Sequence, residues 1–160
     1  MEITPVDCYL SLGSNLGDRT KNLNEAINQL EKLSESRIQK SNFHQTSPQG
    51  FESSNNFINC CVKIITSMQP EELLKKLQTI EIQIGRKEKS NNGIYKDRFI
   101  DIDIIFYGQL IYSSKNLTIP HPLYQKRSFV LIPLLEINSR LIHPSTKISL
   151  EQSFRNISTK

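Results

Sequence analysis

Two aspartates spaced two residues apart carry the clearest chemical signal in this sequence. Asp101 and Asp103 stand within residues 99–107, a segment that is otherwise apolar. Its period-two alternation is typical of a β-strand and places both aspartates beside Phe99 on one face, opposite Ile100, Ile102 and Ile104. Carboxylates at this spacing lie roughly 6.5–7 Å apart at Cα and repel each other by about 2–3 kcal/mol at an effective dielectric of 20. An oxygen-only pair on a rigid strand is typical of Mg²⁺, which completes its shell with waters and phosphate oxygens.

The strand by itself leaves another interpretation open, because an exposed antiparallel strand often carries acids on its solvent face. The neighbouring segments favour metal and phosphate chemistry instead. Cationic side chains both precede and follow the aspartates: Arg86, Lys87, Lys89, Lys96, Arg98, His121, Lys126 and Arg127. Carboxylates for a metal and Arg or Lys for phosphate oxygens are what a Mg²⁺-bound triphosphate requires. The sequence lacks a Gly-x-x-x-x-Gly-Lys-Ser/Thr motif, which excludes a P-loop enzyme.

The composition predicts one globular domain over residues 1–160. A hydrophobic content of 37% supplies enough apolar side chains for a core, and a charged content of 22% fits a folded, soluble protein. The net charge of +4 weakly favours anionic partners such as nucleotides. Because Cys8, Cys60 and Cys61 form no Cys-x-x-Cys motif, we expect buried, reduced thiols rather than zinc ligands. With neither a signal peptide nor a long apolar run, we expect a cytoplasmic protein. We also expect it to be a monomer.

Periodicity and turn signals divide the chain into alternating strands and helices. We expect strands at residues 8–12, 38–46, 57–66 and 99–107, and helices that begin at Asp18 and Pro70, the second ending at Gly85. Further predictions are loops at 13–18, 47–56 and 86–97, a returning hairpin arm at 110–112, an extended segment at 117–122, and short helices at 127–137 and 150–157. This order, βαββαβ, predicts an antiparallel sheet with both helices on one face and the C-terminal elements partly covering the other.

The strand predicted at residues 57–66 extends the candidate site. Phe57 and Asn59 share one of its faces with Cys61 and Lys63, and its other face is more apolar: Ile58, Cys60, Val62 and Ile64. If the apolar faces of this strand and of the aspartate strand both meet the helices, Phe57 and Asn59 emerge with the two aspartates on the open face. An aromatic ring, an amide and two carboxylates would form a binding site there. The alternative is that Phe57 joins a second core layer.

In order and spacing, several segments resemble the 6-hydroxymethyl-7,8-dihydropterin pyrophosphokinase family, whose members act in folate synthesis. The most specific are Arg-Phe-Ile-Asp-Ile-Asp-Ile at 98–104, Leu-Thr-Ile-Pro-His-Pro at 117–122 and Arg-Ser-Phe-Val-Leu at 127–131. The other matching segments are residues 9–17, 46–50, 57–60 and 80–86. The resemblance implies a ferredoxin-like α+β fold and the transfer of pyrophosphate from ATP to the hydroxymethyl oxygen of the pterin, leaving AMP.

The resemblance implies a metal and nucleotide site around the aspartates. Asp101 and Asp103 match the ligands of two Mg²⁺ ions, and Arg86 and Arg98 match basic residues that join them in catalysis. The co-substrate ATP would be bound by the residues at the family's nucleotide positions: Gln78, Glu81, Arg86, Arg98, Ile104, Thr118, His121 and Arg127.

The resemblance also implies that the pterin lies between two aromatic rings. Phe57 and Phe129 match the stacking pair, and Asn59 matches the amide that reads the hydrogen-bonding edge of the pterin. The remaining positions that match pterin contacts are Thr46, Ser47, Gln49 and Tyr95. Residues 47–56 and 86–97 resemble loops that close over the substrates and exclude water, which would otherwise hydrolyse ATP.

Several positions depart from the family pattern. Glu88 stands where many members have a second Arg, and Tyr95 stands where others have Trp, which offers a larger ring. Asn116 and Pro122 stand where some members place Arg and Tyr on the nucleotide. We therefore expect weaker ATP binding at those edges and a retained activity.

Two other functions compete with this hypothesis. A βαββαβ sheet also serves as an RNA-binding module, but such a module needs exposed aromatic and basic residues on its central strands. Here the strand carries Asp101 and Asp103, which repel phosphate unless a metal is bound. A catalytically silent pterin-binding relative is the second alternative, and the intact aspartates argue against it. We expect ATP and the pterin as partners, and neither nucleic acid nor a membrane.

Overall fold

An antiparallel sheet of five strands forms the centre of the computed structural model, which describes residues 4–46, 56–85 and 98–158. Its strands are β1 (Val6–Ser14), β2 (Gln39–Lys40), β3 (His44–Thr46), β4 (Phe57–Thr66) and β5 (Asp101–Tyr107). The order across the sheet is β2-β4-β1-β5, and β3 also pairs with β4. All these pairings are antiparallel, so the antiparallel sheet predicted from the βαββαβ order of the elements is confirmed.

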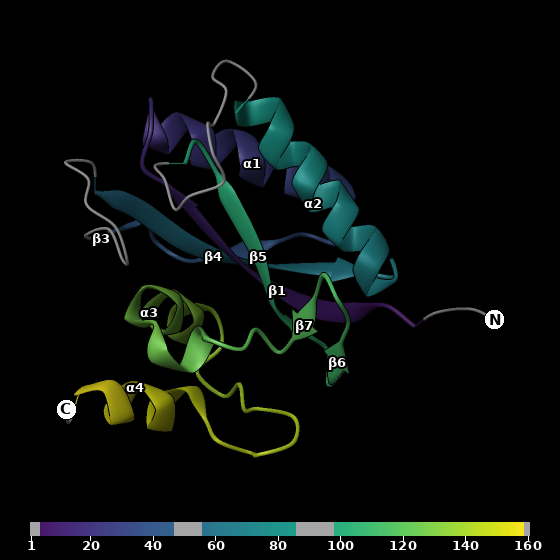
Figure 1. Ribbon diagram of the computed structural model, residues 1–160, viewed down its shortest axis with the longest axis vertical. Coiled ribbons are helices and arrows are strands. Elements are labelled where there is room, and N and C mark those ends of the chain that lie inside the picture. The colour runs from purple at the N-terminus through teal and green to yellow at the C-terminus, as the bar shows by residue number, and fades with distance from the viewer. Residues whose placement is uncertain (1–3, 47–55, 86–97, 159–160) are drawn as a thin grey trace.

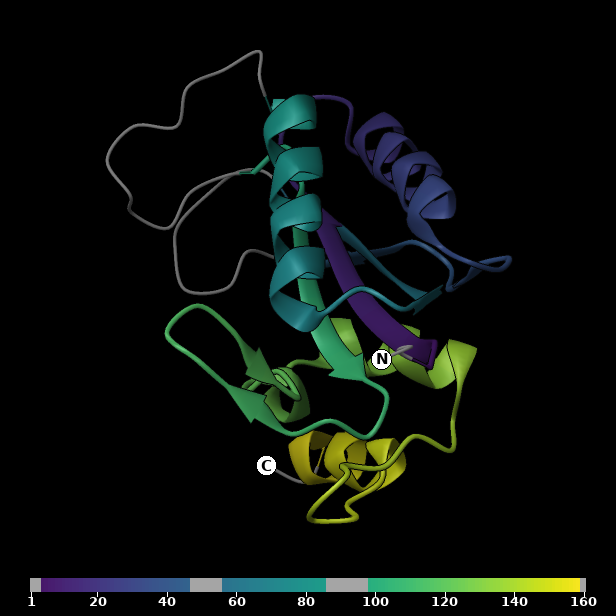
Figure 2. The same ribbon diagram turned by 90° about the vertical axis from the view of Figure 1, so that its right-hand side faces the viewer.

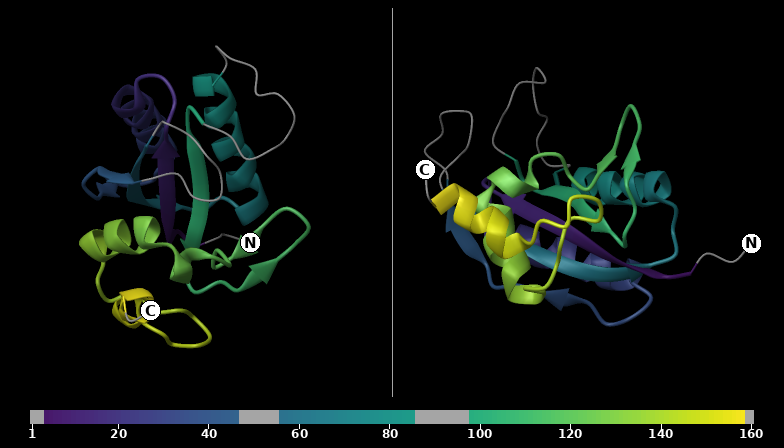
Figure 3. Two further views of the ribbon diagram at one scale, coloured as in Figure 1. Left: turned by 60° about the vertical axis from the view of Figure 1, so that its left-hand side comes forward. Right: turned by 90° about the horizontal axis from the view of Figure 1, so that it is seen from below.

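Two pairs of helices enclose the sheet, one pair on each face (Figure 1). The first pair is α1 (Arg19–Leu33) and α2 (Pro70–Gly85), and the second is α3 (Ser128–Ile137) and α4 (Leu150–Ser158). α4 lies on the outer side of α3 (Figure 3). A short 3-10 helix, η1 (Tyr124–Lys126), precedes α3, and a hairpin of β6 (Tyr112–Ser113) and β7 (Thr118–Ile119) projects beside the start of α2 (Figure 2). None of the described helices has the length and apolar character needed to span a membrane.

The helices begin where local signals predict. The Asp18 side chain accepts a hydrogen bond from the Lys21 N–H at 3.1 Å and caps α1. α2 starts with Pro70, followed by Glu71 and Glu72 in its first turn, where negative charge favours the helix dipole. Both short C-terminal helices expected from the sequence are present as α3 and α4.

The sheet has an apolar core on each face. Alternate residues of its central strands, together with Ile100 just before β5, pack against α1 and α2: Leu10, Leu12, Cys60, Val62, Ile64, Ile102 and Ile104. The opposite core joins the sheet to η1, α3 and α4: Tyr9, Cys61, Phe106, Tyr124, Leu131, Leu134 and Leu150. The predicted faces of β4 and β5 are therefore confirmed, and the C-terminal elements do cover part of the second face. The three cysteines are free and buried, as expected.

The strand expected over residues 38–46 is divided in two. The Ser41 N–H donates to the Cys61 carbonyl at 2.9 Å, but the Cys61 N–H donates to the Ser41 hydroxyl, also at 2.9 Å, instead of to a carbonyl. A side chain thus takes the place of a main-chain acceptor, and β2 ends at Lys40 before β3 resumes at His44.

The strand that carries the aspartates is shorter than predicted, and the segment that follows it pairs differently from the prediction. β5 begins at Asp101, and Phe99 lies in a bend where its ring is 3.1 Å from the position that a Cβ on Gly17 would occupy. The prediction that Phe99 lies beside the aspartates on the strand was therefore wrong. The arm expected at residues 110–112 does not return to β5, because β6 pairs with β7 and Tyr112 donates to Glu71 of α2 at 2.6 Å.

Ser153 on α4 is 2% exposed, and among the described residues its hydroxyl has no hydrogen-bond partner. We expect Ser153→Ala to raise the free energy of unfolding by about 0.5–1 kcal/mol, because it removes an unsatisfied buried hydroxyl and Ala has the higher helix propensity. Urea denaturation of the two proteins measures the difference. A less stable variant would mean that the hydroxyl makes a stabilising bond, for example to a buried water.

Candidate active site

The C-terminal part of β1 separates two groups of polar side chains on the face away from α1 and α2. Gly13 pairs with Asn59 on β4 and with Asp101 on β5, and Ser11 pairs with Asp103. Neighbouring strands lie about 4.8 Å apart, so Asn59 and Asp101 are separated by roughly 10 Å across Gly13. The sheet thus brings together the amide and the aspartates that the sequence placed in different segments.

Gly13 leaves room for the side chain of Asn59. A Cβ on Gly13 would lie 2.8 Å from Asn59 Oδ1 and 3.4 Å from the Phe57 ring. On its other side Asn59 Nδ2 donates to Thr46 Oγ1 at 2.6 Å, which fixes the amide with Oδ1 toward Gly13. Thr46 and Phe57 are paired across the β3–β4 ladder. Three of the residues predicted to bind the pterin therefore lie side by side.

Three carboxylates gather at the start of β5. Glu81 of α2 accepts a hydrogen bond from the main-chain N–H of Ile102, at 2.7 Å, between the two aspartates. Burial raises the pKa of Glu81 and the pKa of Asp103, and the charge of Asp101 raises both further. Glu81 also shares a side-chain hydrogen bond with Asp101. This concentration of partly buried negative charge is unfavourable unless a cation compensates it.

Two arginines lie within electrostatic reach of the acids. Arg127 and Arg98 both lower the pKa of Asp103, although less than burial raises it. Arg98 is held in place by Asn15, whose Oδ1 accepts a bond from the Arg98 N–H at 2.5 Å and whose N–H donates to the Arg98 carbonyl at 2.9 Å. The Arg127 guanidinium lies 5.6 Å from the ring centroid of Phe129. Arg127 therefore connects the acid cluster with the second ring predicted to stack on the pterin.

His121 is kept neutral beside these groups. Burial, followed by the charge of Arg127, lowers the pKa of His121 to about 4. Its Nδ1 accepts a hydrogen bond from the Leu123 N–H at 3.0 Å. The neutral ring consequently carries its proton on Nε2, as a hydrogen-bond donor suited to a phosphate oxygen.

The other predicted residues fall into three groups. Gln78 is exposed on α2, one turn before Glu81, and Thr118 is exposed on β7. Ile104 is 3% exposed within the helix-side core, so only its main chain is left for a contact with nucleotide. The remaining predicted residues lie outside the described parts of the chain: Ser47, Gln49, Arg86 and Tyr95, together with Glu88.

The donors fit a Mg²⁺ ion that takes most of its ligands from substrate and water. In residues 4–46, 56–85 and 98–158, no group of three or more His, Cys, Asp or Glu side chains forms a ready-made metal cage. Asp101 and Asp103 offer carboxylate oxygens on one face of a rigid strand. One or two carboxylates plus phosphate oxygens are the usual protein contribution to a Mg²⁺ site, and a cation there would relieve the repulsion between the acids.

The sequence did not reveal the parts played by Gly13 and Asn15. Gly13 is needed because β4 places the Asn59 amide and the Phe57 ring beside it, and Asn15 fastens the loop after β1 to Arg98. The signal was present as Gly-Ser-Asn directly after an apolar strand. Its meaning depends on which strands flank β1, and that pairing is tertiary information.

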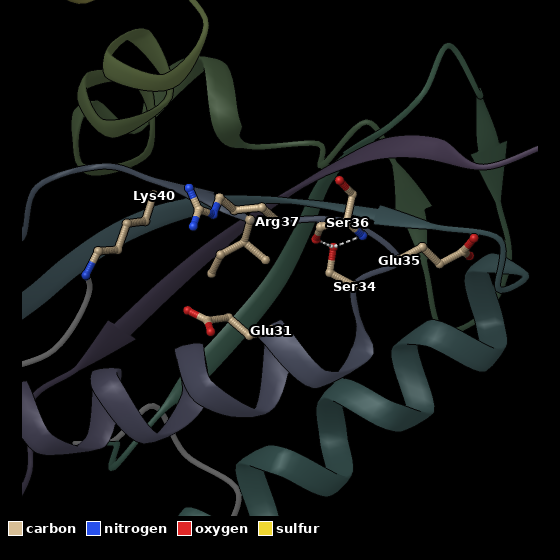
Figure 4. Close-up of a pocket in the computed structure, with 7 residues that line it drawn as sticks. Glu31, Ser34, Glu35, Ser36, Arg37 and Lys40 are labelled. Carbon is tan, nitrogen blue, oxygen red and sulfur yellow. Dashed lines mark hydrogen bonds between the residues drawn. The ribbon is translucent and has the colours of Figure 1, made fainter.

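A separate surface hollow of about 580 Å³ lies at the end of α1 (Figure 4). Apart from Ile38, its lining is charged or polar: Glu31, Ser34, Glu35, Ser36, Arg37 and Lys40. The Ser34 hydroxyl is occupied by the main chain, since it accepts from the Ile65 N–H at 3.0 Å and donates to the Ser36 carbonyl at 2.6 Å. Ile65 lies at the end of β4 away from Asn59, so the hollow is remote from the acid cluster.

Sequence comparisons with known proteins agree with one another. A family model described as 7,8-dihydro-6-hydroxymethylpterin-pyrophosphokinase (HPPK) matches residues 9–139. The 2-amino-4-hydroxy-6-hydroxymethyldihydropteridine pyrophosphokinase of Aquifex aeolicus is 42% identical over 145 residues, which cover 90% of this chain and 88% of that protein. The folic acid synthesis protein fol1 of Pneumocystis carinii is 42% identical over 149 residues, 93% of this chain. Because the match covers 20% of fol1, the chain spans about a fifth of that relative's length.

Solved structures give the same fold. Wild-type HPPK-DHPS of Plasmodium falciparum with SDX-DHP superposes with a TM-score of 0.76 at 14% identity, over 99% of this chain and 45% of the other. A structure of HPPK-DHPS in complex with substrates has a TM-score of 0.71 at 15% identity, over 96% of this chain and 43% of the other. At such low identity this likeness supports the fold alone.

Proposed function

Because the chain belongs to the 7,8-dihydro-6-hydroxymethylpterin-pyrophosphokinase family, we propose that it transfers the β,γ-pyrophosphate of ATP to the hydroxymethyl oxygen of 6-hydroxymethyl-7,8-dihydropterin. The products are the pterin diphosphate and AMP, and the reaction belongs to folate synthesis. The observation that carries this proposal is the placement of Asn59 and Asp101 on either side of Gly13. One side is suited to the pterin and the other to metal-bound phosphates, at a separation of roughly 10 Å.

Pterin recognition combines stacking with an oriented amide. Phe57 on β4 and Phe129 on α3 supply flat apolar surfaces for the two faces of the ring. Asn59 presents Oδ1 in a fixed direction because Thr46 holds its Nδ2. Stacking supplies affinity, and the buried amide supplies selectivity for the hydrogen-bonding edge of the substrate. Thr46 and residues that follow it complete the contacts proposed for the pterin.

The acid cluster and its cations make up the triphosphate side. We propose two Mg²⁺ ions held by Asp101 and Asp103, which would neutralise phosphate charge and polarise the phosphoryl oxygens. Arg98 and Arg127 pair with phosphate oxygens, and His121 donates its Nε2–H to another. The remaining nucleotide contacts are proposed at Gln78, Glu81, Arg86, Ile104 and Thr118. Together these groups hold ATP so that its β-phosphorus faces the hydroxymethyl oxygen, which lowers the entropic cost of attack.

We further propose that the chain works as a cytoplasmic monomer, with ATP and the pterin as its partners and without nucleic acid or a membrane. The three cysteines support a reducing compartment, since each is buried and none forms a disulfide.

Product analysis tests the proposed reaction. The purified chain is incubated with ATP, Mg²⁺ and the reduced pterin, and the nucleotides are separated by ion-exchange chromatography. We expect AMP in a one-to-one ratio with consumed pterin, and none when either the pterin or Mg²⁺ is omitted. ADP in place of AMP would identify a simple kinase. No nucleotide product, together with salt-sensitive RNA binding, would favour the RNA-binding alternative.

Phe129 offers a test of the pterin stack. Phe129→Ala should weaken pterin binding by about 1–3 kcal/mol, because one face of the ring loses its apolar contact. The affinity for an ATP analogue should change much less. Calorimetric titration with each ligand measures both values, and an unchanged pterin affinity would contradict the placement of Phe129 in the stack.

A further inference from the structure

The carboxylate of Glu136, near the end of α3, binds two residues of the segment that leads into the pterin site. Its Oε1 accepts a hydrogen bond from the main-chain N–H of Asn42 at 2.9 Å. Its Oε2 lies 2.8 Å from Nε2 of His44. These contacts link positions 94 and 92 residues apart in the chain, so they fix tertiary structure rather than a local turn.

Glu136 binds the chain where the edge of the sheet is interrupted, between the end of β2 at Lys40 and the start of β3 at His44. Ser41 still pairs with Cys61, partly through its hydroxyl, and β3 resumes only at His44. At Asn42 the acceptor of the main-chain N–H is a side chain of α3, not a neighbouring strand. Because β3 has three residues and pairs with β4 alone, few contacts determine its position.

β3 carries Thr46, the residue that orients the Asn59 amide proposed to bind the pterin. His44 pairs with Asn59, and Thr46 pairs with Phe57, in the β3–β4 ladder. Thr46 then accepts the hydrogen bond from Asn59 Nδ2 at 2.6 Å. A shift of β3 would move the acceptor on which the direction of the Asn59 amide depends.

α3 carries the opposite wall of the same site. Phe129 and Glu136 are seven residues apart, about two helical turns, and so lie on one face of α3. α3 contacts both β3 and β4. The link through Glu136 therefore joins the strand that orients Asn59 to the helix that presents Phe129.

We propose that Glu136 is a positioning residue for the pterin, which sets the spacing between β3 and α3 by binding Asn42 and His44. It acts through these two residues and touches no reacting atom. The inference rests on the proposed function, because it takes the pterin as the ligand that lies between Asn59 and Phe129. It predicts a selective effect on pterin binding and little effect on ATP.

Three variants test this role: Glu136→Ala, Glu136→Gln and, as a matched surface control on α1, Glu25→Ala. Each is titrated with 6-hydroxymethyl-7,8-dihydropterin in the presence of Mg²⁺ and a non-hydrolysable ATP analogue, so that the measurement needs no turnover. We expect Glu136→Ala to weaken pterin binding about tenfold, which corresponds to ~1.4 kcal/mol. The analogue itself should bind within about twofold of the wild type. Glu136→Gln should restore most of the affinity, since an amide offers an acceptor to Asn42 and a second polar group to His44.

Unchanged pterin affinity in Glu136→Ala, or an equal loss for pterin and ATP analogue, would overturn the proposal and leave Glu136 a general stabiliser of the fold. If Glu136→Ala does not fold, His44→Ala removes one arm of the contact and should show a smaller loss with the same selectivity. A wild-type chain that binds the pterin but releases no AMP would contradict the proposed reaction alone, because the comparison of pterin affinities would still decide the role of Glu136. A wild-type chain that binds no pterin would overturn both.

Discussion

Replacing Asp103 with Asn is expected to abolish pyrophosphate transfer while making the metal-free protein more stable. The substitution keeps the shape of the side chain but removes the charge that would hold Mg²⁺ against the phosphates. A loss of several kcal/mol of charge stabilisation corresponds to a rate lower by roughly a thousandfold or more. The same change removes the repulsion with Asp101 and Glu81, for a gain of about 1 kcal/mol, or roughly 2–4 °C in Tm.

The pH dependence of stability gives this prediction a second signature. Burial and the charge of Asp101 raise the pKa of Asp103 to about 7, against about 3.9 in an unfolded chain. Between these values the folded state binds more protons than the unfolded state, so the free energy of unfolding falls as pH rises. We therefore expect the metal-free wild type to lose stability from pH 5 to pH 8, and Asp103→Asn to lose less of it.

Thermal unfolding in EDTA at several pH values, together with assays of AMP release, checks both signatures. Asp7→Asn is a suitable control, because Asp7 lies at the far end of β1 and is half exposed. The control should retain activity and the pH profile of the wild type. Near-normal turnover in Asp103→Asn would refute the metal assignment, and an unchanged pH profile would show that Asp103 is not the buried acid described.

Gly13→Ala is expected to damage pterin binding far more than it damages the fold. The added Cβ would lie 2.8 Å from Asn59 Oδ1, which is the end of a side chain and can move aside. The movement turns the amide away from the pterin and strains its bond to Thr46. We expect the KM for the pterin to rise by roughly 10- to 100-fold, equivalent to 1.4–2.8 kcal/mol, with the KM for ATP nearly unchanged.

A double-mutant cycle isolates the contact responsible. In an Asn59→Ala background the added methyl group of Gly13→Ala meets no amide, so its effect on the pterin KM should largely disappear. Additive effects of the two substitutions would contradict the close approach of Gly13 to Asn59. Urea denaturation of Gly13→Ala serves as the check that the loss of affinity does not come from unfolding.

The strands of the site could be predicted because their periodicity is strong and each faces a covered layer. Isoleucines at alternate positions of β5, and the apolar set of β4, identify the helix-side face without knowledge of the partners. The polar residues left on the opposite face, Asn59 and the two aspartates, then had to share it. The matching segments of a known family supplied the roles that the alternation alone left open.

The features that sequence analysis missed depend on residues far apart in the chain. The Ser41 hydroxyl interrupts the edge strand because it lies beside Cys61, and the Glu136 carboxylate meets Asn42 across 94 residues. The small size of Gly13 matters only because β1 pairs with β4, which places Asn59 beside it. None of these pairings follows from local propensity, so tertiary structure was required to find them.

We propose that Asp101 and Asp103 hold divalent ions against ATP beside the pterin. The most direct measurement replaces Mg²⁺ with Mn²⁺ and counts bound ions by electron paramagnetic resonance, with a non-hydrolysable ATP analogue and the pterin both saturating. We predict about two Mn²⁺ per wild-type chain and fewer in Asp101→Asn and Asp103→Asn at the same free metal concentration. Equal Mn²⁺ binding by all three proteins would show that these aspartates do not hold the ions.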